Sequence, residues 1–367
     1  MSFHSVKLSR RSFLSASAGA LVASSLPPLT LSVAASATPR RIILDTDPGV
    51  DDALAIFLAL RSPEFKVEAI TPVSGNVPLS LTLPNALRLV EITGRTDVPV
   101  AAGAATPLVR RLVTAQYVHG NNGLGGAEFP EPKLKPVSEN AAQIICRIVR
   151  SSPGEITIVG IGPLTNVATA LKSDPDLAPQ IKEIVVMGGS LTSGNITPSA
   201  EFNFYVDPEA ARIVFDSGVP ITMVGLNVTE KVLLGEPQIR ILEAAPNPVS
   251  QAAAKILRST LAHLRAGRGI NTKAMAMHDP LTVAYLIDPT LLTLKDYVVE
   301  IETSGEFTAG ESVAYGSAPE RFSPPMNTSL PTTGTVSRDF KPNAKVAVEV
   351  DPDKFFHLLL SRLTAAA

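Results

Sequence analysis

The chain has 367 residues, of which 45% are hydrophobic and 18% are charged, and its formal net charge is −2. This composition is typical of a globular protein long enough to bury a large core. A near-zero charge without clusters of lysine and arginine argues against nucleic acid as a partner. Because Cys146 is the only cysteine, an intrachain disulfide is excluded.

Residues 1–37 differ in composition from the rest of the chain and predict an export signal. They contain S-R-R-S-F-L at residues 9–14, continue with Ala, Ser and Leu, and end in A-S-A at residues 35–37. The pair Arg10 and Arg11 resembles a twin-arginine address. The alternatives are an ordinary secretory signal or an uncleaved anchor, although Pro27 and Pro28 make the apolar run short for a membrane span. We expect cleavage near Ala37, no membrane anchor afterwards, and export to the bacterial periplasm or the extracellular space.

From residue 38 onward, short apolar runs alternate with segments of helical periodicity. The predicted strands are residues 42–44, 66–72, 98–101, 156–161, 183–187, 221–224 and 344–350, and the predicted helices are 50–60, 85–92, 139–150, 164–171, 208–216, 251–266 and a final helix. The alternation predicts a single α/β domain over residues 38–367, with a mostly parallel central sheet flanked by helices. Residues 319–331, rich in Pro, Ser and Thr, are predicted to be a surface loop, and Cys146 is predicted to lie in the core.

Four carboxylates crowd the segment that follows the first predicted strand. Asp45 and Asp47 fall where the strand ends, and Asp51 and Asp52 open the next helix. A helix N-terminus stabilises one negative charge by only about 0.3–1 kcal/mol, which is too little for several crowded acids. A hard divalent cation, calcium or magnesium, would remove the repulsion, although the spacing is not that of an EF-hand. The alternative is a set of solvated helix-capping acids.

The segment D-T-D-P-G-V-D-D-A at residues 45–53 resembles the N-terminal motif of the inosine-uridine-preferring nucleoside hydrolases. The resemblance extends, in the family's order, over roughly residues 40–360. The other matching motifs are V-S-G-N at residues 73–76, G-P-L-T-N at 162–166, V-M-G-G at 186–189, G-N at 194–195, A-E-F-N-F-Y-V-D-P-E-A at 200–210 and H-D-P at 278–280. The resemblance implies a nucleoside hydrolase-like catalytic domain of open, Rossmann-like α/β architecture, with one calcium ion per subunit.

The resemblance also implies which residues hold the ion and the substrate. Asp47, Asp52 and Asp279 would give carboxylate oxygens to calcium. Ile161, where relatives have Thr, would give its backbone carbonyl. The residues implied at the substrate are Asp51, Asn76, Asn195, Glu201 and Asn203 on the ribose hydroxyls, Met187 under the sugar, Phe202, and His119 near the nucleobase.

The chemistry of N-glycosidic cleavage suits these residue types. Positive charge develops on the sugar, and a carboxylate-rich pocket stabilises it. Calcium lowers the pKa of a bound water, and Asp47 is predicted to take its proton as general base. His278 is predicted to help the base depart, because histidine titrates near neutral pH. The alternatives are that His278 only orients Asp279 and that His119 is a solvated loop residue rather than part of a mobile lid.

The predicted function is hydrolysis of purine and/or pyrimidine ribonucleosides to free base and ribose, by a homodimer or homotetramer. Because the chain has no Trp, a purine site built on Trp stacking is not expected. An inosine-uridine-like or pyrimidine-leaning preference remains, and broad specificity is the first expectation. One alternative is an exported protein that binds or senses nucleosides without turnover, against which an intact Asp47 and His278 argue. Another is a magnesium-dependent phosphatase with an Asp-x-Asp nucleophile, but the lysine and the further acidic pair that such enzymes need are not found.

Overall fold

The computed structural model describes residues 38–268, 273–316 and 341–366, which belong to one compact unit. The predicted export signal at residues 1–37 and the predicted loop at residues 319–331 lie outside the described residues. Within these ranges, no helix combines the length and the apolar content needed to cross a membrane.

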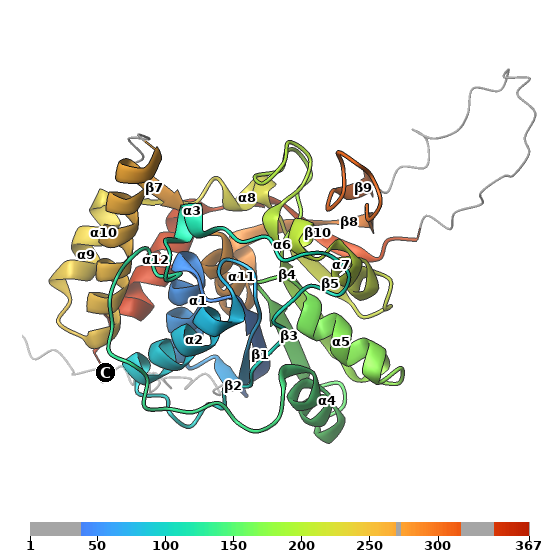
Figure 1. Ribbon diagram of the computed structural model, residues 1–367, viewed down its shortest axis with the longest axis horizontal. Coiled ribbons are helices and arrows are strands. Elements are labelled where there is room, and N and C mark those ends of the chain that lie inside the picture. The colour runs from blue at the N-terminus through green and yellow to red at the C-terminus, as the bar shows by residue number, and fades with distance from the viewer. Residues whose placement is uncertain (1–37, 269–272, 317–340, 367) are drawn as a thin grey trace, which may run out of the picture. The chain divides into compact units, whose positions relative to one another are not determined.

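The described residues form an eight-stranded central sheet with the strand order β2-β1-β3-β4-β5-β10-β8-β9 (Figure 1). The strands are β1 (Arg40–Thr46), β2 (Phe65–Pro72), β3 (Ile156–Gly160), β4 (Glu183–Met187), β5 (Ile221–Val224), β8 (Leu292–Ile301), β9 (Ser312–Gly316) and β10 (Ala344–Val350). The strands from β2 to β10 in this order pair in parallel, and β8 and β9 add an antiparallel edge. The predicted α/β fold with a mostly parallel sheet is confirmed.

The position of β1 sets where a ligand can bind. β1 pairs with β2 on one side and with β3 on the other, so the chain reverses its direction across the sheet at this point. In open α/β sheets, ligands bind at such a switch point, beyond the carboxyl ends of the strands. The segments that follow β1 and β3 therefore border the expected site.

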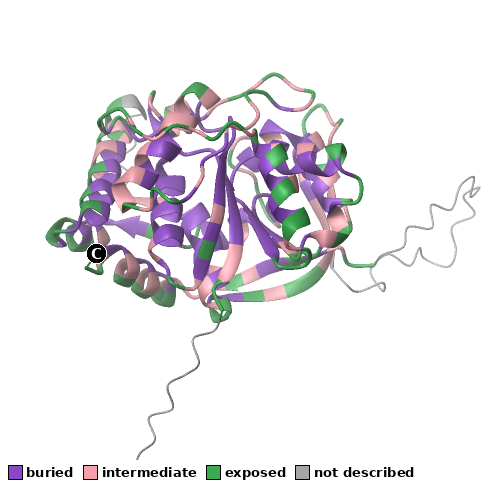
Figure 2. Ribbon diagram, turned by 90° about the horizontal axis from the view of Figure 1, so that it is seen from below, coloured by how far each residue is buried: buried purple, intermediate pink, exposed green. Residues whose placement is uncertain are grey.

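Helices cover both faces of the sheet (Figure 1). Ile42 and Leu44 of β1 belong to one hydrophobic cluster and Ile43 belongs to the other, as the alternation of side chains along a strand requires. Figure 2 shows that the central strands are largely buried. The helices are α1 (Val50–Arg61), α2 (Leu79–Thr93), α3 (Gln116–His119), α4 (Ala141–Ser151), α5 (Thr165–Ser173), α6 (Phe202–Val206), α7 (Pro208–Phe215), α8 (Leu226–Thr229), α9 (Glu236–Ala244), α10 (Pro248–Arg268), α11 (His278–Ile287) and α12 (Pro352–Thr364).

Three sequence predictions differ from the structure. Residues 98–101 form no strand, because Pro99 has no N–H to donate, and only an isolated parallel bridge joins Val100 to Ile70. Helix α2 begins well before residue 85 and contains Pro84, which the sequence rules treat as a helix boundary. Cys146 is half-buried rather than enclosed in the core, although it packs against one of the clusters.

A small second sheet lies outside the central sheet. It pairs β6 (Leu233–Gly235) with β7 (Ala274–Ala276) in antiparallel fashion, and β7 leads directly into α11. The sequence analysis did not predict either strand, because three-residue segments carry too little periodicity to be recognised.

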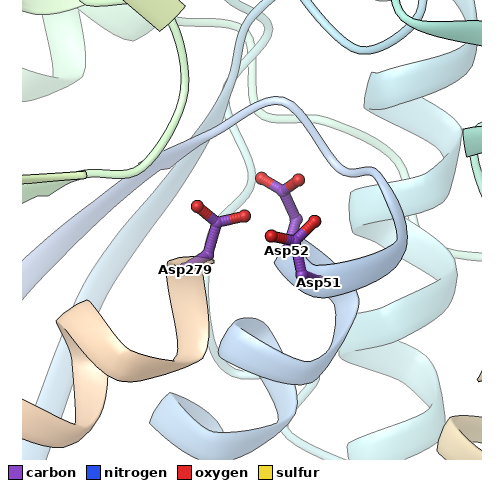
Figure 3. Close-up of side chains that lie close together, drawn as sticks. All are labelled: Asp51, Asp52 and Asp279. Carbon is purple, nitrogen blue, oxygen red and sulfur yellow. The ribbon is translucent and has the colours of Figure 1, made fainter. Parts of the chain in front are cut away.

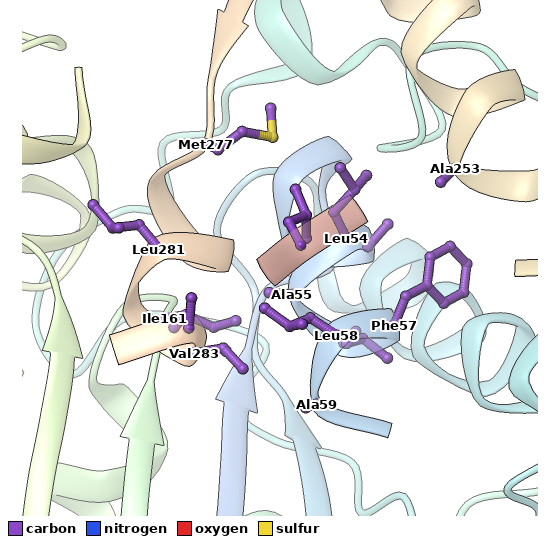
Figure 4. Packing of buried hydrophobic residues seen from close by; sticks show 14 of the residues in the cluster. Leu54, Ala55, Phe57, Leu58, Ala59, Ile161, Ala253, Met277, Leu281 and Val283 are labelled. Atoms are coloured by element: carbon purple, nitrogen blue, oxygen red, sulfur yellow. The ribbon is translucent and has the colours of Figure 1, made fainter. Parts of the chain in front are cut away.

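Replacement of Phe57 tests how much the hydrophobic cluster around α1 contributes to the stability of the fold (Figure 4). Its side chain is fully buried among the residues of that cluster, whereas Phe307 is 80% exposed. Phe57→Ala should lower the free energy of unfolding by about 3–5 kcal/mol, through lost burial and the cavity it leaves. The matched control Phe307→Ala should change it by less than about 0.5 kcal/mol. Denaturant unfolding of both variants measures the difference, and equal losses would contradict this account of the core.

Candidate active site

The crowded carboxylates lie on the turn between β1 and α1, at the switch point of the sheet. Asp52 Oδ1 accepts hydrogen bonds from the Thr46 hydroxyl at 2.6 Å and from the Asp47 amide at 3.1 Å. Its Oδ2 accepts from the amide of Gly49 at 3.0 Å. An acid in the first turn of a helix that reaches back to amides before the helix fixes how the chain enters it. The turn is therefore held in place by one of its own acids.

Asp47 is fully buried beneath this turn and has one oxygen without a protein partner. Its Oδ2 accepts a hydrogen bond from the backbone amide of Asn76 at 2.7 Å, whereas no group in the described part of the chain donates to Oδ1. A Cβ at Gly75 would lie 2.1 Å from Oδ2, and one at Gly162 would lie 2.6 Å from Oδ1, so both positions require glycine. Burial, followed by the charge of Asp52, raises the pKa of Asp47 well above its ordinary value. A buried oxygen of this kind is costly unless a cation or ligand pairs with it.

Helix α11 brings a further carboxylate to the same place. Asp51, Asp52 and Asp279 each offer an oxygen within 4.8 Å of the others. Figure 3 shows that they extend from the first turns of α1 and α11. Burial, followed by the neighbouring carboxylates, raises the pKa of Asp279 well above its ordinary value, and burial also raises the pKa values of Asp51 and Asp52. The raised pKa values show that the protein does not pair these charges, so the three acids favour either protons or a cation between the two helix N-termini.

This set of donors fits a hard divalent cation. Carboxylate and carbonyl oxygens are the ligands that such ions prefer, and the unpartnered Asp47 Oδ1 adds a donor that the protein leaves unused. The predicted ligands Asp47, Asp52 and Asp279 lie together, and the predicted carbonyl donor Ile161 follows β3 on the cavity wall. The tightest group contains Asp51, which the resemblance assigns to the sugar, in place of Asp47. How these acids divide between ion and sugar stays a prediction.

Asp45 is the one acid of the motif that faces away from this group. Its Oδ1 accepts hydrogen bonds from the Thr71 hydroxyl at 2.6 Å and from the Asn166 amide at 2.8 Å. Burial raises the pKa of Asp45 to about 7. Asp45 therefore ties the ends of β1 and β2 to α5 instead of facing the substrate cavity.

A cavity of about 340 Å³ opens above the carboxylates. Asp47 and Asp52 are fully buried and do not line it, whereas all the other residues predicted for the site do. The lining residues that were predicted are Asp51, Asn76, His119, Ile161, Met187, Asn195, Glu201, Phe202, Asn203, His278 and Asp279. The structure thus gathers residues from six separate sequence motifs around one space.

One side of the cavity carries polar groups that suit a sugar. The side-chain amide of Asn203 donates hydrogen bonds to the backbone carbonyl oxygens of Ile161 and Met187, each at 3.2 Å. Its position is therefore fixed between the ends of β3 and β4. The Glu201 carboxylate accepts hydrogen bonds from three backbone amides, at 2.8, 3.0 and 3.1 Å. Burial raises the pKa of Glu201 to about 7. Asn195 Oδ1 accepts from the Phe202 amide at 2.9 Å. Backbone contacts hold each of these side chains before any ligand binds.

Two histidines face the same cavity, of which His119 is buried and His278 is half-buried. The Nδ1 atom of His278 lies 2.7 Å from the Thr229 hydroxyl, and Nδ1 of His119 accepts from the Val50 amide at 3.0 Å. Burial lowers the pKa of His278 to about 4, and burial together with the charge of His278 lowers that of His119 to about 3. The lowered pKa of His278 departs from the expectation that it titrates near neutral pH, because the sequence alone does not reveal how far its surroundings desolvate the ring. The alternative of a solvated His119 is also wrong, since the side chain is buried.

Ten further residues that line the cavity were not predicted from the sequence. The additional lining residues are Val50, Ala115, Tyr117, Val118, Thr260, Leu264, Ala274, Met275, Ala276 and Met277. Thr260 and Leu264 are one helical turn apart on α10, which places both on the same face. These residues reach the cavity only through the tertiary fold, so no local signal could have identified them.

Comparison with known proteins agrees with this geometry. Residues 42–357 match the model of the family described as inosine-uridine preferring nucleoside hydrolase. A pyrimidine-specific ribonucleoside hydrolase, RihA, from Citrobacter koseri is 43% identical over 322 residues, which cover 88% of this chain and 97% of that protein.

Solved structures show the same relationship. A plant nucleoside hydrolase is 35% identical with a TM-score of 0.79, and the match covers 90% of this chain and 100% of that one. A purine-preferring ribonucleoside hydrolase from Gardnerella vaginalis is 30% identical with a TM-score of 0.77, and the match covers 88% and 98% of the two chains.

These matches give no support to the phosphatase alternative, and they favour hydrolysis over binding without turnover. Nucleoside hydrolases are metal-dependent, which agrees with the group of buried carboxylates. The chain belongs to the inosine-uridine preferring nucleoside hydrolase family and is an N-glycosidase that hydrolyses ribonucleosides.

Proposed function

We propose that this protein is a calcium-dependent ribonucleoside hydrolase that prefers pyrimidine bases. The observation that carries the proposal is the group of buried carboxylates at the switch point, next to a cavity with two histidines on its wall. Calcium would be held by the carboxylates of Asp47, Asp52 and Asp279 and by the Ile161 carbonyl, because oxygen ligands at flexible geometry suit this ion. When bound, the ion supplies positive charge that lowers the pKa of water in the site.

The residues of the chain then divide the work of N-glycosidic cleavage. Asp47, whose Oδ1 has no donor among the described residues, accepts the proton of the attacking water. Asp51 and Glu201 hold the ribose hydroxyls, and their negative charge offsets the positive charge that develops on the sugar. His278, a neutral imidazole because desolvation lowers its pKa to about 4, donates a hydrogen bond to the departing base, which leaves as an anion and then takes a proton from solvent.

The preference for pyrimidines rests on the relatives and on the composition of the cavity. The relative named as pyrimidine-specific is 43% identical, whereas the solved structure named as purine-preferring is 30% identical. The chain has no Trp, and the aromatic residues that line the cavity in the described part of the chain are Tyr117 and Phe202, apart from the histidines. The aromatic surface on which a purine base could stack is therefore small.

A panel of nucleosides tests the activity and the base preference together. Uridine and cytidine should release ribose with a kcat/KM about tenfold or more above that of inosine, which corresponds to about 1.4 kcal/mol. Asp47→Ala and His278→Ala should each lower kcat by about 100-fold or more, because each removes a proton-transfer or hydrogen-bonding group. The control His357→Ala, on the exposed side of α12, should leave kcat unchanged.

Three outcomes of the panel would each overturn a different part of the proposal. Faster turnover of inosine would contradict the base preference. Full activity of Asp47→Ala would contradict its role as general base. No ribose release from any nucleoside, with calcium present, would contradict the proposed hydrolysis.

Removal of the ion should destabilise the fold as well as abolish activity. Without a cation the carboxylates at the starts of α1 and α11 repel one another, so a chelator should lower the Tm and added calcium should restore it. At a calcium concentration about 100-fold above Kd, the expected stabilisation is about 2.7 kcal/mol. Asp52→Asn should weaken this response to calcium. Asp207→Asn, which alters a buried acid that caps α7, should retain it. An unchanged Tm after complete metal removal would contradict a structural role for the ion.

We also propose that residues 1–37 direct export by the twin-arginine route, because of the paired Arg10 and Arg11 and the A-S-A end of the segment. Replacement of both arginines by Lys should retain the protein inside the cell, whereas wild type reaches the periplasm. Export of the variant at the wild-type level would exclude this route. Assembly as a homodimer or homotetramer stays a prediction.

A further inference from the structure

The starting observation is the hydrogen bond from the Val50 amide to Nδ1 of His119, at 3.0 Å. Val50 is the first residue of α1, and its amide is one of the N–H groups that a helix leaves without a partner inside the helix. The ring lies directly on Gly49, where a Cβ would come within 2.5 Å of Nδ1 and 2.9 Å of Cε1. The glycine of the D-P-G turn is therefore what allows the imidazole to reach this amide.

This bond determines which ring nitrogen of His119 carries the proton. A backbone N–H can only donate, so Nδ1 must accept and the proton of the neutral imidazole must lie on Nε2. Moving the proton to Nδ1 would set two donors against each other at 3.0 Å and would leave a buried amide unpaired. Nδ1 is occupied in this way, so Nε2 is the ring nitrogen available to the cavity that His119 lines.

We propose that His119 acts as a fixed hydrogen-bond donor, with its proton held on Nε2 by the first amide of α1, and that it binds an acceptor atom of the nucleoside without passing a proton to the leaving base. The inference rests on the proposed function of this site and adds the role of one residue in it. The chemical class of the group that His119 recognises follows directly. It is a carbonyl oxygen or an unprotonated ring nitrogen, because Nε2–H can only donate.

His278 differs from His119 in this respect. Its Nδ1 partner is the hydroxyl of Thr229, which can donate or accept by rotation about its C–O bond. The contact with Thr229 therefore allows either tautomer of His278, whereas the contact with Val50 allows only one of His119. Of the two histidines that face the cavity, His278 can therefore carry its proton on either ring nitrogen, whereas His119 can carry it only on Nε2.

The loop that carries His119 is fixed from several sides. The side-chain amide of Asn85 on α2 donates to the Asn122 carbonyl at 2.8 Å and to the Pro48 carbonyl at 3.3 Å, so it joins this loop to the D-P-G turn. From α10, the Ser259 hydroxyl donates to the Gly125 carbonyl at 2.7 Å. These contacts hold the ring over the start of α1. Burial also lowers the pKa of His119 to about 3, so the neutral state that the bond requires is maintained at neutral pH.

The tautomer can be measured without reference to activity. In the purified, calcium-loaded protein labelled with ¹⁵N-histidine, the imidazole of His119 should give a protonated Nε2 and an unprotonated, hydrogen-bonded Nδ1. The resonances are assigned by their absence in His119→Gln. A protonated Nδ1, or rapid averaging between the two tautomers, would overturn the proposal.

Two substitutions separate a fixed donor from a proton carrier. Gln places an amide N–H near the position of Nε2 but cannot transfer a proton, whereas Leu removes the donor. If His119 only donates, His119→Leu should raise KM for uridine about tenfold with a smaller effect on kcat, and His119→Gln should recover most of that loss. A collapse of kcat in both variants, with KM unchanged, would show that His119 passes a proton and would overturn the proposal.

The two proposals fail in different ways. Absence of ribose release by the wild-type protein would remove the proposed function, and the tautomer would still be measured as described. Normal ribose release together with a protonated Nδ1 would remove only the assignment of His119. Loss of the acceptor for the Val50 amide should lower the Tm of both variants, but with calcium bound the Tm should stay above the assay temperature, which shows that the kinetic comparison concerns folded protein.

Discussion

Repulsion among carboxylates that the backbone holds in one buried space is the constraint on which the rest of this site depends. Two of these acids open α1 and one opens α11, and these two helices pack against each other. The helix N-termini contribute some positive potential, but each offsets only a fraction of one charge. Glycines at positions 75 and 162 bring the backbone so close to Asp47 that no side chain could shield it. The surroundings thus hold the acids together without giving their charges partners, so a small hard cation can take the place of the protons that their raised pKa values favour.

The rest of the site consists of side chains that the backbone fixes in advance. Glu201 is held by three amides, Asn203 by two carbonyl oxygens and His119 by one amide. Because these contacts exist before a ligand arrives, little reorganisation is required when charge develops on the sugar. The architecture explains how this is possible. The carboxyl ends of neighbouring parallel strands meet at one edge, and each strand delivers a loop to the same space.

Much of this arrangement could be predicted from the sequence, because its signals are local. The D-T-D-P-G-V-D-D-A segment combines an apolar run, a turn and acids in a first helical turn, and each part has its own sequence signature. The part of the wall that Thr260 and Met275 form could not be predicted in this way, because these residues come to one cavity only through the tertiary fold. The electrostatic state of His278 was also beyond the sequence, since its pKa depends on burial that distant elements produce. Two prolines show that one local signal can have different outcomes. Pro99 lies where no strand forms, whereas Pro84 lies within helix α2.

The packing of α10 has a consequence for how the specificity of this enzyme can change. One turn of this helix supplies Thr260 to the cavity wall, and the adjacent residue, Ser259, is bonded to the glycine-rich loop that carries His119. A Cβ at Gly125 would lie 1.9 Å from the Thr260 hydroxyl, so the helix and the loop have no spare space between them. A larger residue at position 260 would therefore change the cavity wall and press on the loop that carries His119 at the same time. Adaptation to a new nucleobase through α10 would call for paired substitutions in the loop, which narrows the evolutionary routes open to this cavity.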